Sequence, residues 1–216
     1  MFTRPQIATV VAEFLGTATL VMVALIMSQT TAVSYFIGTS LAVTLAALFL
    51  FFGNISGAQL NPALTFGLWT ARQISTLRAV LYVAAQLLGG LAALELFQYL
   101  VGRDLPAKNL AFNTPMWLAE VVGTAVLAVA IAVVVSRKLD SFSSALALGA
   151  GIFTGVIVAG TASAGYINPA IALGERSFNS VYVLGPLVGG LIGVNLYMML
   201  MTPRASRPSR LSRRRK

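Results

Sequence analysis

One triplet occurs twice in this sequence, at a fixed distance. Asn61-Pro62-Ala63 recurs as Asn168-Pro169-Ala170, 107 residues later. Glu13 and Glu120 are also 107 residues apart, and both lie in an Ala-Glu-x-x-Gly-Thr string. Two unrelated landmarks that share one offset indicate a tandem duplication. The fold must therefore accommodate two copies of one unit.

Hydropathy places both copies in a membrane. Of the 216 residues, 57% are hydrophobic and 10% are charged, and the mean hydropathy is +0.85. A membrane-spanning helix needs about 20 mostly apolar residues. Six windows meet this need, at roughly 7–28, 34–54, 78–101, 116–136, 142–162 and 180–202. Three spans in each copy reverse the polarity of the second copy, which predicts an inverted repeat.

Two further apolar segments are too short to cross a bilayer. They run from Asn61 to Trp69 and from Asn168 to Gly174, about two helical turns each. Paired short segments at matching positions of two halves mark the solute site of transporters. We therefore predict an all-α membrane protein with six transmembrane helices and two re-entrant half-helices. Residues 1–107 form the first repeat, 108–202 the second, and 203–216 a basic tail.

The positive charges predict the orientation. With both termini in the cytoplasm, twelve of the fifteen Lys and Arg residues lie inside, and only Arg103, Lys108 and Arg176 lie outside. The expected location is the cell (plasma or inner) membrane, crossed several times. The basic tail follows the same charge rule, with a contact to anionic lipids as its functional alternative. This distribution argues against nucleic acid as a partner.

The composition also excludes most kinds of catalytic site. The chain has no Cys and no His, which excludes thiolate and imidazole metal sites and Ser–His or Cys–His nucleophiles. The six acidic residues are scattered. We expect no enzyme activity, no cofactor and no metal.

Each Asn-Pro-Ala triplet is a favourable helix start. The Asn side-chain oxygen can cap the first turn, Pro at the first helical position has no N–H to lose, and Ala favours the helix. The Asn amide then still offers N–H donors. Inversion brings two such starts together at mid-membrane, where positive dipole ends oppose cations and a water or hydroxylated solute can accept hydrogen bonds from Asn61 and Asn168.

These motifs resemble the aquaporin (major intrinsic protein) family over nearly the whole chain except the tail. The matching strings are 12–17, 56–64, 86–90, 119–124, 166–170 and 185–190. The resemblance implies a homotetramer of separately conducting subunits in the lipid bilayer, with passive and bidirectional permeation of small uncharged solutes. Half-helix dipoles that exclude protons are a property of such pores.

The resemblance also implies where the narrow constriction lies. Its four positions correspond here to Leu41, Val156, Gly165 and Ile171. Most family members carry Arg at the position of Ile171, so this chain is an atypical member. None of the four side chains has a hydrogen-bonding group. We expect a wider and more apolar constriction that favours neutral solutes such as water, glycerol-like molecules or metalloid hydroxides, arsenite among them.

Two alternatives remain open for the outer end. The apolar ring can instead belong to a non-conducting or gated protein with a dewetted pore. Arg176 can stand in for the missing Arg, but its neighbour Glu175 favours a paired residue on the rim. An ion channel is disfavoured because no charged ring lies near the filter.

Glu13 and Glu120 are acidic residues inside predicted spans, where such groups are functional candidates. A proton relay is one reading. The structural reading is preferred: each carboxylate accepts N–H groups of the irregular loop before its half-helix, as the family resemblance also implies.

Overall fold

The computed structural model describes residues 3–108 and 110–201, and these residues form helices and connecting loops without a strand. Within these described residues, six helices are long and apolar enough to cross a membrane. They are α1 (Arg4–Thr30), α2 (Ser34–Ser56), α4 (Thr76–Val101), α5 (Thr114–Arg137), α6 (Ser141–Ala159) and α8 (Ser180–Met201). The predicted all-α fold with six spans is confirmed. The predicted tail, 203–216, lies outside the described residues.

Two short helices complete the fold. They are α3 (Pro62–Thr70) and α7 (Pro169–Gly174), close to the two predicted half-helices. α6 ends three residues earlier than its hydropathy window, because residues 160–163 turn back to start the loop that leads to α7. Hydropathy could not place that end, since the turn is itself weakly polar.

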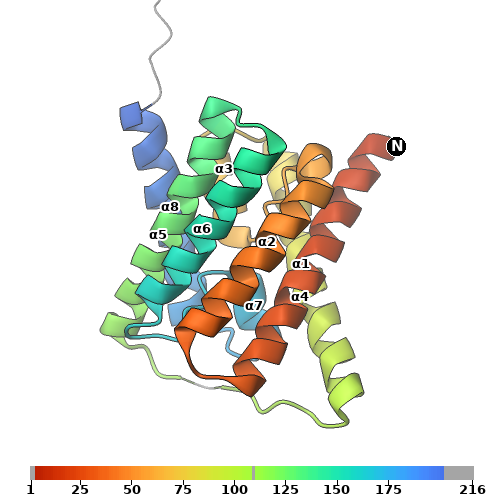
Figure 1. Cartoon of the computed structure of the whole chain (residues 1–216), viewed down its shortest axis with the longest axis vertical. Helices are drawn as coiled ribbons and strands as arrows, with labels where there is room; N and C mark the ends of the chain where they lie inside the picture. Colours follow the sequence, from red (N-terminus) through yellow and green to blue (C-terminus); the bar gives the residue numbers. More distant parts are fainter. Residues whose placement is uncertain (1–2, 109, 202–216) are drawn as a thin grey trace, which may run out of the picture.

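The long helices pack in pairs around the half-helices. α5 packs on α8, α2 on α6 and α1 on α4, while α3 lies against α8 and α7 lies against α4. The N-terminus and the end of α8 lie at one face of the bundle, at the top of Figure 1. The link from α4 to α5 lies at the opposite face, and α3 and α7 lie toward different faces.

The outer surface of the bundle is apolar. Large hydrophobic side chains are exposed along every long helix, for example Val43, Phe51, Tyr99, Phe142 and Met199. A soluble protein rarely exposes so extensive an apolar surface. Together with the six apolar helices, this surface identifies a multi-pass membrane protein.

A glycine brings each half-helix close to a long helix. A Cβ atom on Gly90 of α4 would lie 2.7 Å from the carbonyl oxygen of Ala170 in α7. Gly190 of α8 makes the matching approach to the carbonyl oxygen of Ala63 in α3. Both obstacles are backbone atoms, so any side chain at these positions would displace a half-helix.

Replacement of Gly90 by Leu tests this packing. The added side chain must push α7 away from α4, and we expect Gly90→Leu to lower the free energy of unfolding by about 1–3 kcal/mol. The control is Ala84→Leu, which adds similar bulk on the exposed side of the same helix. Unfolding in detergent measures both, and equal stability of the two variants would refute the close contact.

Candidate functional site

The two half-helices begin with the same cap. The Asn61 side-chain oxygen accepts the N–H of Ala63 at 2.8 Å, and that of Asn168 accepts the N–H of Ala170 at 2.9 Å. Pro follows each Asn at the first helical position. Both helix starts therefore satisfy a free N–H within the triplet itself, as the sequence predicts.

The two triplets are also joined directly to each other's loop. The amide nitrogen of Asn61 donates to the carbonyl oxygen of Ile167, and that of Asn168 donates to the carbonyl oxygen of Leu60, both at 2.9 Å. These bonds are reciprocal across the repeat. An Asn side-chain amide has two N–H donors. Each Asn therefore keeps one N–H that can face a solute.

The carbonyls of Leu60 and Ile167 belong to strained residues. Their φ angles are 49° and 43°, in the left-handed region that branched side chains avoid. Such residues cost about 1–3 kcal/mol each and persist only when their surroundings hold them. Here each is held on both sides: its carbonyl by the opposite Asn, and its N–H by a buried carboxylate.

Glu13 is the first of these carboxylates, and it is completely buried. One of its oxygens accepts from the Ser56 hydroxyl at 2.6 Å and the Gln59 N–H at 3.0 Å. The other accepts from the Leu60 N–H and the Gln86 side-chain amide, both at 2.8 Å. Four hydrogen bonds thus connect one side chain of α1 to the end of α2, to the loop before α3 and to α4.

Glu120 makes the corresponding contacts in the second repeat. Its carboxylate accepts from the Ser163 hydroxyl at 2.7 Å, the Tyr166 N–H at 3.1 Å and the Ile167 N–H at 2.7 Å. Ser163 lies 107 residues after Ser56. That shared offset is a signal in the sequence from which the two serines can be identified.

A cavity of about 260 Å³ opens at the face that carries the α4–α5 link. Leu41, Gly165 and Ile171 line it, so three of the four predicted constriction positions meet in one place. Val156 does not line the cavity, but its carbonyl oxygen would lie 3.0 Å from a Cβ atom on Gly165. The four positions are therefore neighbours, with Val156 behind Gly165.

Gly165 is also required by the backbone. Its φ is +68°, a conformation that residues with a side chain rarely adopt. Glycine at this position therefore permits the turn that leads into α7.

A lysine from the α4–α5 link enters this cavity. The Lys108 ammonium donates to a Glu175 carboxylate oxygen at 2.8 Å and to the Tyr166 hydroxyl at 3.0 Å. Among the described residues, the ion pair of Glu175 is therefore with Lys108, and the expected pairing with Arg176 is wrong. Arg176 has φ +53° and is exposed on the rim.

The Lys108 ammonium remains charged in this position. Burial lowers its pKa, but the hydrogen bonds to Glu175 and Tyr166 and the negative charge of Glu175 outweigh that effect. The pKa of Lys108 therefore lies above the usual value for lysine. Sequence spacing gave no signal for Lys108, because its approach depends on how the link folds across the mouth.

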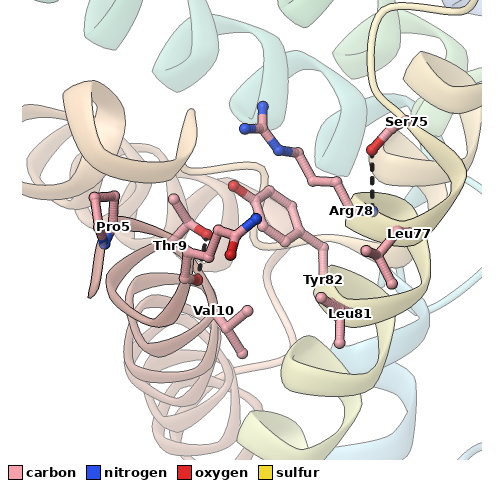
Figure 2. A pocket seen from close by; sticks show the side chains of 9 residues that line it. Pro5, Thr9, Val10, Ser75, Leu77, Arg78, Leu81 and Tyr82 are labelled. Atoms are coloured by element: carbon pink, nitrogen blue, oxygen red, sulfur yellow. Dashed lines mark hydrogen bonds between the residues drawn. The ribbon is translucent and has the colours of Figure 1, made fainter. Parts of the chain in front are cut away.

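A second cavity, of about 190 Å³, lies between the first turns of α1 and α4. Figure 2 shows Thr9 and Val10 of α1 facing Arg78 and Tyr82 of α4. The Tyr82 hydroxyl donates to the Ser56 carbonyl at 3.0 Å, and the Arg78 guanidinium lies 6.0 Å from the tyrosine ring centre. None of the predicted site residues lines this cavity.

The sequence profile of the major intrinsic protein family matches residues 2–197 of this chain. This chain belongs to the major intrinsic protein family. Aquaporin-1 of Homo sapiens is 32% identical over 223 residues, covering 91% of this chain and 83% of the human protein. Aquaporin-1 of Mus musculus is 34% identical over 169 residues, covering 71% of this chain and 63% of the mouse protein.

A solved structure has the same fold. The aquaglyceroporin from Plasmodium falciparum superposes with a TM-score of 0.75 over 90% of this chain and 96% of its own, at 20% sequence identity. The arrangement of six spans and two half-helices is therefore that of the major intrinsic proteins.

Glu13→Gln tests how strongly the buried carboxylate stabilises the fold. The new amide places an NH₂ group where two donors now point at an oxygen, and we expect a loss of about 2–4 kcal/mol in the free energy of unfolding. Glu95→Gln is the control, because Glu95 is an exposed acid on α4. Thermal unfolding in detergent compares them, and a Glu13 variant as stable as the control would contradict the assigned network.

Proposed function

We propose that this chain is a passive channel for small neutral solutes: water, glycerol-like molecules or metalloid hydroxides such as arsenite. The observation that carries this proposal is the meeting of the two half-helix starts. Asn61 and Asn168 each have one side-chain N–H free after capping and cross-linking. A solute that accepts both bonds is oriented there, while the positive ends of the two helix dipoles oppose cations and protons.

Leu41, Val156, Gly165 and Ile171 are proposed to form the constriction that selects solutes. Three of them line the outer cavity, and none has a side-chain donor or acceptor. A constriction without Arg is wider and more apolar than one with Arg. It therefore favours neutral solutes that have some apolar surface over strongly hydrated ones.

The proposed location is the plasma or inner membrane, and the proposed assembly is a homotetramer with both termini of each subunit in the cytoplasm. The sidedness of the charges supports this orientation: Arg4, Arg72, Arg78 and the 137–138 pair lie at the helix ends on the face of the N-terminus.

Glu13 and Glu120 are proposed to hold the loops before the half-helices in place. Neither an enzymatic role nor a cofactor is part of this proposal, and the basic tail is assigned to the cytoplasm, where anionic lipids attract it.

A closed or gated pore is the second candidate function. Leu41 and Ile171 line the outer cavity but are each only 1% exposed, so little open space remains beside them. An apolar narrowing can stop permeation by dewetting.

Solute flux into liposomes that contain the purified protein distinguishes the open channel from the closed pore. Permeability to water, glycerol, urea and arsenite above that of empty liposomes supports the channel, and equal permeability supports the closed pore.

Ile171→Arg tests the position of the constriction. The long charged side chain fills space beside Leu41 and Gly165, so we expect glycerol permeability to fall about tenfold relative to water permeability. Ile171→Leu, which conserves volume, is the control and should keep the ratio of the original protein. Stopped-flow light scattering measures both fluxes. An unchanged ratio in the Arg variant would place residue 171 outside the constriction.

A further inference from the structure

We propose that Lys108 is a specificity-determining residue of this channel, supplying at its outer mouth the hydrogen-bond donor that the apolar constriction lacks. The solutes it favours are small neutral molecules with oxygen acceptors, such as polyols and urea-like amides. This inference rests on the proposed function and assigns a role to a residue outside the Asn-Pro-Ala motifs and the four constriction positions.

Lys108 lies directly on the path to the constriction. It lines the same cavity as Ile171 and Glu175. At the end of α7, the N–H of Glu175 donates to the carbonyl oxygen of Ile171 at 2.9 Å, so these two residues lie one helical turn apart on the same side. The backbone of Glu175, which anchors the ammonium, therefore lies about one turn further out than that of Ile171, a rise of about 6 Å.

Three contacts fix the position of the lysine. Its backbone N–H donates to the carbonyl oxygen of Arg176 at 2.8 Å, and its ammonium donates to Glu175 and Tyr166. The ammonium lies 5.7 Å from the Tyr166 ring centre and 3.0 Å from its hydroxyl, which places it at the hydroxyl end of the ring rather than over the face. Tyr166 is itself packed against Tyr182, with ring centres 4.6 Å apart.

The ammonium retains one donor for a solute. A lysine ammonium has three N–H groups, and two are taken by Glu175 and Tyr166. The Lys108 side chain is 38% exposed, whereas that of Glu175 is 1% exposed. Glu175 is thus a buried anchor, and Lys108 is the member of the pair that a solute in the cavity meets.

A donor at this point offsets part of the cost of entering the constriction. A solute that passes Leu41 and Ile171 must give up hydrogen bonds to water, and the apolar side chains there replace none of them. The charged N–H of Lys108 forms a strong bond to a hydroxyl or carbonyl oxygen just before that step. Glycerol carries three hydroxyl groups and gives up more water partners than one water molecule does, so its entry depends more on the donor.

Lys108→Met tests this role, because Met has similar length and neither charge nor donor. In liposomes, we expect the ratio of glycerol to water permeability to fall about tenfold, as loss of one hydrogen bond to a charged group predicts. Lys108→Arg should restore most of the ratio. Arg176→Met is the matched control: it removes an exposed cation from the same rim and should leave the ratio within about twofold of the original.

The outcomes separate selection from a merely structural role. If Lys108→Met lowers both permeabilities equally, or if Arg176→Met has the same effect, Lys108 only secures the link and the inference is overturned. If Lys108→Met does not fold, Glu175→Gln is measured, since it keeps the ammonium but weakens its anchor. A fall of about threefold in the ratio then supports the inference, and no change overturns it.

Failure of the proposed function gives a different result. Flux of the original protein no greater than that of empty liposomes overturns the channel and this inference together. A conducting original protein with an unchanged ratio in Lys108→Met overturns only the role of Lys108.

Discussion

Backbone N–H and C=O groups cannot lie at membrane depth without partners, and this fold places two irregular loops there. The buried carboxylates of Glu13 and Glu120 supply partners for the N–H groups, because each accepts two backbone N–H groups of its own loop. The side-chain amides supply partners for two carbonyls: Asn168 donates to Leu60, and Asn61 donates to Ile167. These bonds fix where α3 and α7 begin. The position of the helix starts, and with it the proposed solute site, depends on four polar side chains within an otherwise apolar bundle.

The contacts at the centre of the molecule differ from those at the outer mouth in how far they are shared by the two halves of the chain. At the centre, the Asn bonds between the loops and the carboxylate bonds to the loop N–H groups occur in both halves, whereas the bond from the Gln86 amide to Glu13 occurs in the first half alone among the described residues. The outer mouth has no such counterpart, since the position that corresponds to Glu175 in the first repeat is Leu68, a buried apolar residue of α3. The proposed solute-orienting site is therefore built from matching residues of the two halves, whereas the Lys108–Glu175 pair at the outer mouth has no match in the first half.

Hydropathy and the repeated motif were sufficient to predict the six spans and both half-helices, because each depends on local length and capping. The neighbourhood of Leu41, Gly165 and Ile171 required the family resemblance, since no local pattern brings those residues together. Lys108 could not be predicted at all: its contacts with Glu175 and Tyr166 depend on the path of the α4–α5 link in three dimensions. For Glu175 a signal existed, because it lies four residues after Ile171 and thus on the same side of α7.

The reciprocal bonds between the two loops have a consequence for synthesis. The carbonyl oxygen of Leu60 accepts its hydrogen bond from Asn168, which lies 108 positions further along the chain. At about 5–20 residues per second, a ribosome needs roughly 5–20 s to reach that residue. During this interval the first half resides in the membrane with a strained loop that its own sequence cannot complete. The two halves therefore finish folding together, and only after the second triplet has been translated.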